Sequence, residues 1–390
     1  TSGVHWLSEQ SEVEWIEPKF ERILFNDVAD DIVSADVLRS ATQMAGINSA
    51  WNALDGTGII VAVSDTGLDN GINNTNMHPD FKDHIVDIHS YGIPPSAQSW
   101  VNAPYNDGAS DLDSGHGTHV AGSVLGDGTQ SSGAITGIAP EARLYMQATE
   151  VWTDWTTAAE SNFGYTDDYT LMGIPDDLSE MFDAAADNGS HIHTNSWGAS
   201  VAGQYNINSM QTDHSARNHS GMLILFAAGN SGTDANSNGE VDHDSMGSPA
   251  TSKNVLTVGA SENNRSTITS EWGAWWSTDF PQDPINSDKM ANNSEGMAGF
   301  SSRGPVDDGR ITPDVSAPGT FILSTKSRQT TDTGWLAHSN SDYTHMGGTS
   351  MATPITAGAS ALLYQHLIDN LGYTDPTSAL VKGIIAVSAH

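Results

Sequence analysis

The chain has 390 residues and carries 14 lysines and arginines against 48 aspartates and glutamates, a formal net charge of −34. So acidic a surface repels nucleic acid and argues against a nucleic-acid partner, whereas it suits a secreted or salt-adapted protein or simply keeps a protein in solution. The absence of cysteine excludes disulfides, thiol nucleophiles and cysteine zinc sites, and no apolar run is long enough to cross a membrane.

The first 25 residues read differently from the rest of the chain. Residues 11–18 alternate apolar and polar side chains, which predicts a strand with one buried face that ends at Pro18. Neither a basic start nor an apolar run marks a secretory leader at Thr1. We therefore expect either a cytoplasmic protein or a processed form of a longer one.

From about residue 26 the pattern becomes that of an α/β protein. Buried parallel strands are predicted by short, β-branched apolar runs at 59–63, 142–147, 191–196, 223–228 and 255–260. Helical stretches are predicted between them at 119–125, 178–188 and 349–367. Strands that alternate with helices predict a parallel sheet covered on both faces, with ligand sites at the carboxyl ends of the strands. Two polar stretches, 151–177 and 262–293, read as surface insertions.

Three short segments carry residues with catalytic chemistry. Asp65 ends the first buried strand, His116 lies at a glycine-rich helix start, and Ser350 lies at the N-terminus of an alanine-rich helix. A serine nucleophile needs a base within roughly 2.6–3.2 Å, and an imidazole titrates near neutrality. A carboxylate on the other ring nitrogen fixes the tautomer, and a helix N-terminus favours developing negative charge. Together the three residues predict a catalytic triad.

Each of these segments also has a simpler interpretation. Asp65 alone would suit a turn after a strand, and Ser350 alone would suit a helix cap. His116 and His119 are three residues apart and could hold a zinc ion from one helical face, although no HExxH pattern or third ligand accompanies them. The joint occurrence of all three segments, in the order Asp, His, Ser, favours catalysis.

A fourth segment, 224–232, is predicted to be a strand that runs into a tight turn bearing Asn230. An amide there could donate a hydrogen bond to the oxyanion of a tetrahedral intermediate, and losing such a donor typically costs ~10²–10³ in turnover. The alternative is an ordinary turn asparagine before a small residue.

These segments resemble the four signatures of the subtilase family, at 65–67, 116–122, 227–230 and 348–354. The resemblance extends from about residue 26 to His390. It implies a three-layer α/β subtilisin-like fold with a central, mostly parallel sheet, and the activity of a serine endopeptidase. It also implies that Asp65, His116 and Ser350 form the triad and that Asn230 binds the oxyanion.

The same resemblance implies a substrate cleft with two walls. The walls of the S1 pocket would be Ser196, Trp197 and Gly198 on one side and Ala227, Ala228 and Gly229 on the other. The first wall would also pair with the substrate backbone as an added strand; the alternative is that Trp197 simply packs at the end of a core strand. Small walls leave room for a large side chain, so we expect protein and peptide substrates, broad specificity, and Phe, Tyr, Leu or Met favoured at P1.

Three further runs, 192–198, 300–305 and 318–323, resemble the oxidatively stable alkaline subtilases in particular. Those enzymes are secreted, bind calcium and carry a β-sandwich after the catalytic domain. We therefore expect a secreted, extracellular enzyme made as a zymogen and inhibited by its own prodomain. Residues 1–25 would be a prodomain remnant or an ordinary N-terminal extension. Residues 26–390 would be the catalytic domain, without its last strand and the β-sandwich domain that the resemblance implies. We expect either truncation or proteolytic nicking, and after nicking the cleaved C-terminal part could stay bound non-covalently.

A loop that follows Asn230 has the spacing of a calcium site. Residues 234–242 alternate oxygen-bearing side chains, with a glycine at the sixth position, as in EF-hand-type loops around one hard cation. The candidate ligands are Asp234, Asn236, Asn238, Glu240 and Asp242. Because Ser245 occupies the twelfth position, Asp242 or Asp244 would have to complete the site. The alternative is a polar surface loop.

Two other functions stay open at this point. One is a non-catalytic calcium-binding surface protein that keeps this fold, although all four chemical positions are filled. The other is a transpeptidase or macrocyclase that uses the same acyl-enzyme with a different acceptor.

Overall fold

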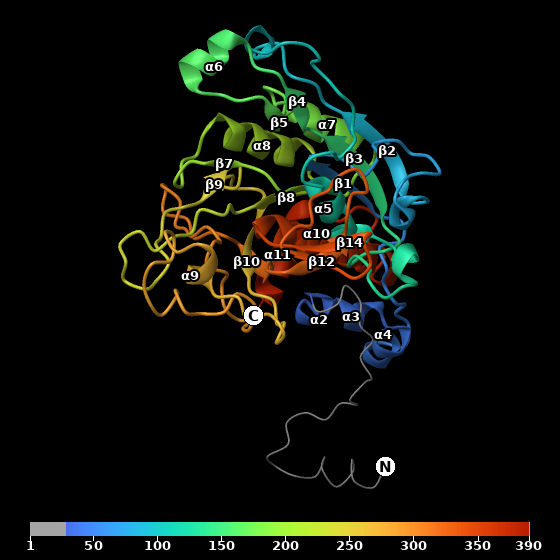
Figure 1. Cartoon of the computed structure of the whole chain (residues 1–390). Helices are drawn as coiled ribbons and strands as arrows, with labels where there is room; N and C mark the ends of the chain where they lie inside the picture. The colour runs from blue at the N-terminus through green and yellow to red at the C-terminus, as the bar shows by residue number, and fades with distance from the viewer. Residues whose placement is uncertain (1–28, 390) are drawn as a thin grey trace.

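The computed structural model describes residues 29–389, so the predicted strand at 11–18 and the predicted remnant at 1–25 lie outside the described residues. A seven-stranded sheet forms the centre, in the order β11-β10-β8-β6-β1-β3-β2 (Figure 1). The strands are β1 (Ile60–Asp65), β2 (Ile85–Ser90), β3 (Arg143–Ala148), β6 (Ile192–Asn195), β8 (Leu223–Ala227), β10 (Leu256–Ser261) and β11 (Val315–Pro318). All neighbours in this sheet pair in parallel, which confirms the predicted parallel α/β architecture.

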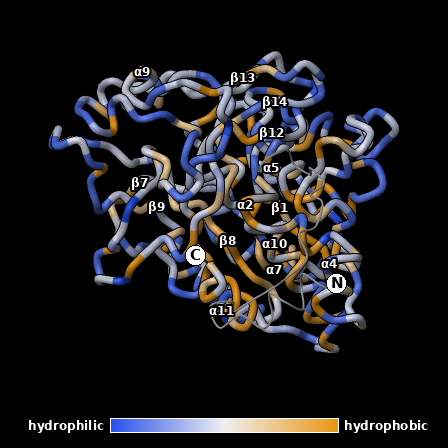
Figure 2. Tube along the Cα trace, turned by 90° about the horizontal axis from the view of Figure 1, so that it is seen from below, coloured by the Kyte–Doolittle hydropathy of each residue, from blue (hydrophilic) through white to orange (hydrophobic). Residues whose placement is uncertain are grey.

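The sheet separates two hydrophobic clusters because successive residues of a strand point to opposite faces. Val61 and Val63 of β1 face one cluster, whereas Ala62 faces the other. The first face is covered by α5 (His116–Leu125) and α10 (Thr349–Gln365), and the second by α7 (Ser179–Asp187) and α8 (Ile207–Asn218). Hydrophobic segments gather around β1, β8 and α10 when the chain is seen from below (Figure 2). The predicted three layers are therefore present.

The five strands predicted from apolar runs are those inside the sheet, and the two that the sequence did not indicate are its edges. The edge strand β2 alternates in burial because only one of its faces is well covered, so it lacks a continuous apolar run. The three predicted helices also form, and α10 continues into a π-helical turn at His366–Asn370. None of the helices between residues 29 and 389 is long and apolar enough to cross a membrane.

Smaller elements surround this core. Three short helices lead into the sheet: α2 (Ala29–Ile32), α3 (Ala35–Arg39) and α4 (Ala41–Ile47). The first predicted insertion forms β4 (Val151–Thr153), α6 (Thr157–Phe163) and β5 (Asp168–Thr170), and the second contains α9 (Trp272–Trp275). The other strands and the last α-helix are β7 (Ala199–Ser200), β9 (Gly247–Ser248), β12 (Ile322–Thr325), β13 (Leu336–Ala337), β14 (Tyr343–Met346) and α11 (Ser378–Ser388).

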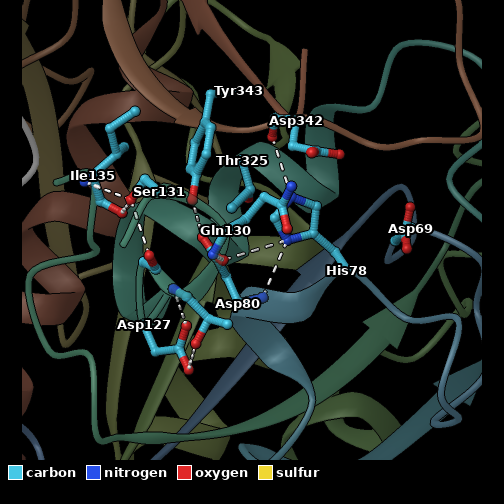
Figure 3. A network of polar contacts seen from close by, with 12 residues as sticks. Asp69, His78, Asp80, Asp127, Gln130, Ser131, Ile135, Thr325, Asp342 and Tyr343 are labelled. Atoms are coloured by element: carbon cyan, nitrogen blue, oxygen red, sulfur yellow. Dashed lines mark hydrogen bonds and ion pairs between the residues drawn. The ribbon is translucent and has the colours of Figure 1, made fainter. Parts of the chain in front are cut away.

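A polar network around the buried Asp80 joins the loop after α5 to strand β14 (Figure 3). The carboxylate of Asp80, which is fully buried, accepts the Gln130 backbone N–H at 2.8 Å and the Tyr343 hydroxyl at 2.7 Å. His78 contacts the Asp342 carbonyl at 3.2 Å through Nε2 and accepts the Asp80 backbone N–H through Nδ1. Burial raises the pKa of Asp80, and its two donors oppose that rise. The network thus holds the loop after α5 against the strand that leads to Ser350.

Candidate active site

Asp65, His116 and Ser350 come from three element ends on one side of the sheet. Asp65 is the last residue of β1, His116 the first of α5, and Ser350 the second of α10. His116 Nδ1 lies 2.6 Å from Asp65 Oδ1, and the Asp65 side chain is only 2% exposed. The fold therefore forms the predicted carboxylate–imidazole pair, with Nδ1 directed at the carboxylate.

The environment of this pair sets its charge. Asp65 Oδ1 also accepts the Thr66 backbone N–H at 2.8 Å, whereas the buried Oδ2 has no hydrogen-bond partner between residues 29 and 389. Burial alone would lower the pKa of His116, but the charge and hydrogen bond of Asp65 outweigh burial, so this pKa lies above its ordinary value. The imidazole is thus a stronger base than an unperturbed histidine side chain.

The start of α5 is held by Asp111, which the sequence analysis did not single out, and by Thr66, which follows Asp65. The Asp111 carboxylate is fully buried and accepts the Thr118 backbone N–H at 2.8 Å, so it caps the first turn of the helix. Thr66 Oγ1 donates to Asp111 at 2.9 Å and accepts the Gly117 backbone N–H at 2.7 Å. Burial raises the pKa of Asp111 to about 6. Asp111 lies in a polar run without periodicity, so no pattern marked it.

His119 fixes the other side of the same helix. Its Nε2 lies 3.0 Å from the Ile322 carbonyl and 3.2 Å from the Thr344 carbonyl, so it reaches both strands of the β12–β14 pair. Burial lowers the pKa of His119 to about 3, so the ring stays neutral and Nε2–H donates. With Nε2 engaged by two carbonyls, His119 acts as a structural brace, and the zinc alternative for His116 and His119 gains no support.

Ser350 is held against the first predicted wall by a reciprocal pair of hydrogen bonds. Its hydroxyl donates to the Ser196 carbonyl at 3.1 Å, and the Ser196 hydroxyl donates to the Ser350 carbonyl at 2.9 Å. The second bond has a clear origin: Pro354, four residues further on, has no N–H to give that carbonyl. Attack on a substrate would require the Ser350 hydroxyl to turn from Ser196 towards His116.

Asn230 lies beside the N-terminus of α10 with its amide orientation fixed. Its Oδ1 accepts both the backbone N–H and the hydroxyl of Thr349, each at 2.9 Å, which leaves Nδ2 as the free donor. Gly348 has φ +143°, and a Cβ there would lie 3.3 Å from Asn230 Nδ2 and 3.5 Å from Ser350 N. Because Gly348 has no side chain, an oxygen atom can occupy this position close to both N–H donors, as an oxyanion site requires.

The predicted walls lie next to each other, but the Trp197 side chain points away from them into the core. Ser196 is buried, whereas Gly198 is exposed. The Trp197 indole packs in the core against Phe226 with ring centroids 5.2 Å apart, and its Nε1 donates to Ser64 at 3.1 Å. The backbone of this wall can still meet a substrate, while the indole itself serves packing.

Beyond the walls, the chain forms a polar hollow. Ser200 and Ser231, which follow the two walls, share a hydrogen bond of 2.9 Å between their hydroxyls. Both also line a hollow of about 680 Å³, whose other lining includes Asp242, His243 and Asp244. The predicted wall made by Ala227, Ala228 and Gly229 starts at the last residue of β8 and leads directly to Asn230.

The predicted calcium ligands lie in one loop that is closed by its own hydrogen bonds. Asp234 is fully buried and accepts the backbone N–H groups of Asn238 and Gly239 at 2.8 and 2.9 Å. Asp242 accepts from Ala235 and from the Asn236 amide. Asn238 Oδ1 accepts the Glu240 backbone N–H at 2.9 Å. Oxygens of the right type are therefore present, but Asn236 offers its nitrogen to Asp242. In the part of the chain that the structure describes, no group of three His, Asp or Glu side chains is arranged around a metal position.

Comparisons with known proteins found similar sequences. Residues 56–389 match the sequence profile of the Subtilase family. The chain is 29% identical over 339 residues to the serine protease AprX of Bacillus subtilis (strain 168), covering 85% of this chain and 62% of AprX. It is 27% identical over 439 residues to the serine protease/ABC transporter B family protein tagD of Dictyostelium discoideum, covering 97% of this chain but only 22% of tagD. The chain thus spans less than two thirds of either relative.

Among solved structures, Sphericase is similar in fold. It superposes with a TM-score of 0.52 at 23% identity, covering 86% of this chain and 84% of Sphericase. At that identity the likeness concerns the fold alone, and it confirms the predicted three-layer arrangement around a parallel sheet.

The Asp65–His116 pair generates a prediction about pH. The kcat/KM for a peptide should rise as His116 loses its proton, with a midpoint above the ordinary value of 6.5. Asp65→Asn removes the charge that raises this pKa, so the midpoint should move to lower pH and the turnover should fall by about 10⁴.

The matched control is Asp183→Asn, because Asp183 Oδ1 lies at the same 2.6 Å from His219 Nε2 on the surface of α7 and α8. This variant should leave the pH profile unchanged. A wild-type midpoint that stays in place in Asp65→Asn would contradict the assignment.

Proposed function

This chain belongs to the subtilase family, and on that footing we propose that it is a serine endopeptidase that hydrolyses peptide bonds through an acyl-enzyme. The observation that carries the proposal is the 2.6 Å contact between Asp65 and His116 on the side of the sheet where Ser350 and Asn230 also lie. A carboxylate–imidazole pair and a serine at a helix N-terminus are the parts needed for acyl transfer.

In the proposed reaction, each residue has one role. The Ser350 oxygen attacks the scissile carbonyl while His116 Nε2 takes the hydroxyl proton, and Asp65 stabilises the resulting imidazolium through Nδ1–H. The oxyanion accepts hydrogen bonds from Asn230 Nδ2 and the Ser350 backbone N–H, one of the helix-start donors that have no partner within the helix. His116 then gives its proton to the leaving amine as the C–N bond breaks. Water, deprotonated by His116, hydrolyses the acyl-enzyme and restores the serine.

Chemical labelling tests whether Ser350 is the nucleophile. A fluorophosphonate should add one label per chain to the wild type, seen as a single mass increment in the intact protein, and Ser350→Ala should abolish it. Ser378→Ala is the matched control, because Ser378 is the first residue of α11 and lies outside the site. Labelling that persists in Ser350→Ala would refute the proposal. Product analysis with an amine acceptor distinguishes hydrolysis from transpeptidation.

For substrate specificity, we propose broad recognition with a large apolar P1 side chain favoured. The support is the small size of Gly198, Ala227, Ala228 and Gly229, because small walls leave space that an apolar side chain can fill. In a peptide series that varies only at P1, Phe should be cleaved about tenfold to hundredfold more efficiently than Gly, as burial of an aromatic side chain allows. A strong preference for Arg or Lys would contradict this and would point to the hollow beside Asp242 and Asp244.

We also propose that the loop 234–242 binds one structural calcium ion, which would brace the turn that carries Asn230. The support is its oxygen-rich spacing and the two backbone N–H bonds that organise the Asp234 carboxylate. Chelation of the wild type should then lower the melting temperature by a few degrees and reduce activity, because a ligand that binds only the folded state stabilises it.

Asp234→Asn should lose this dependence on calcium, whereas Glu295→Gln, on an exposed loop, should keep it. A melting temperature and an activity that are both insensitive to chelation would refute the calcium proposal.

Finally, we propose that the protein is secreted and made with an inhibitory prodomain, as in the oxidatively stable alkaline subtilases that its motifs resemble. The support is the alternating run at 11–18 and the acidic composition. N-terminal sequencing of protein recovered from culture medium tests both parts: a single start at Thr1 would argue against removal of a remnant, and absence from the medium against secretion.

A further inference from the structure

Glu150 lies beside the catalytic pair without being part of it. It follows β3, the strand that pairs with β1, where Ala148 lies opposite Asp65. Its backbone N–H donates to the Thr66 carbonyl at 3.3 Å, and the preceding N–H, of Thr149, donates to the Asp65 carbonyl at 2.9 Å. The backbone of Glu150 is thus tied to the two residues that orient His116.

The carboxyl group of Glu150 is buried and incompletely bonded. The residue is only 9% exposed, and its Oε2 is shielded from solvent with no hydrogen-bond partner among residues 29–389. Burial, followed by the charges of Asp111, Asp113 and Asp65, raises the pKa of Glu150 to about 8, and the charge of His116 opposes the rise. Leaving a buried acceptor unpaired is costly, so a group that brings a positive charge or a donor would be strongly favoured there.

The surroundings of Glu150 suit a cation with an aliphatic stem. The hairpin that starts at the next residue places the Trp152 ring 5.2 Å from the Tyr169 ring, across the β4–β5 pair. Burial, and then the charges of Asp107, Glu150 and Asp113, raise the pKa of Tyr169. Asp113 is exposed. Its pKa is raised first by partial burial and then by the charges of Asp168 and Asp332. Aromatic rings and carboxylates together are the surroundings that lysine and arginine side chains prefer.

The strand order indicates which substrate residue would reach this place. The two proposed P1 walls follow β6 and β8, whereas Glu150 follows β3, on the other side of β1 and the Asp65–His116 pair. A substrate that pairs as an extended strand points successive side chains in opposite directions. When P1 enters between the walls, the preceding residue, P2, therefore points away from them, towards His116 and β3.

We propose that Glu150 is the base of a subsite that binds a lysine or arginine side chain at the P2 position of the substrate. The cation would give Oε2 the donor it lacks, the stem would pack on the Trp152–Tyr169 pair, and Asp113 would attract the charge from the rim. This proposal rests on the proposed peptidase function and deepens it, because it makes substrate choice depend on P2 as well as P1.

The test compares two peptides that share Phe at P1 and differ only at P2, Lys against Gln, using the full chain. The wild type should cleave the Lys peptide with a kcat/KM about tenfold to hundredfold higher, the range expected for a charged hydrogen bond in a buried place. Glu150→Gln, which keeps the shape, should reduce this ratio to within about threefold. Asp113→Asn, at an exposed position with little risk to folding, should reduce it partly.

The control is Glu141→Gln, an exposed carboxylate at the opposite end of β3, which should keep the wild-type ratio. A wild-type ratio near one would overturn the subsite, and so would a Lys preference that Glu150→Gln leaves intact. Both outcomes differ from failure of the proposed function, which would appear as loss of Ser350 labelling in the wild type. Labelling of Glu150→Gln at the wild-type rate would show that its catalytic residues are still in place.

Discussion

The 2.6 Å hydrogen bond between Asp65 and His116 is the constraint on which the rest of this site depends. It requires the end of a central strand and the start of a helix to be held in one fixed position relative to each other. The fold meets this requirement with buried polar contacts rather than apolar packing alone. Asp111 caps the first turn of α5, Thr66 links that cap to β1, and His119 ties the helix to the β12–β14 pair. Each contact is directional, so together they allow one placement of the imidazole.

The serine half of the site is built by the same means. Pro354 deprives the Ser350 carbonyl of its helical donor, and the Ser196 hydroxyl fills that role, so a wall of the cleft is joined to the nucleophile. Thr349 fixes the amide of Asn230, which aims Nδ2 at the helix start. The network around Asp80 then connects the two halves, because it links the loop after α5 to the strand that leads to Ser350.

The sequence allowed the inner strands, the layers and the four chemical positions to be predicted, because buried parallel strands need apolar runs and acyl transfer needs particular residue types. It did not reveal the edge strands, whose one-sided burial breaks the run. Asp111 was missed because it lies in a polar run without periodicity, and the burial of Glu150 beside Thr66 depends on a contact far apart in sequence. The direction of the Trp197 indole depends on Phe226 and Ser64, contacts that short motifs do not encode.

The most direct measurement of the central claim is a crystal structure of the chain carrying a covalent phosphonate. The account predicts phosphorus bonded to Ser350 Oγ, with one phosphonyl oxygen accepting hydrogen bonds from Asn230 Nδ2 and the Ser350 backbone N–H, and with His116 still on Asp65. A phosphonyl oxygen that faces solvent away from Asn230, or an adduct on another residue, would contradict it.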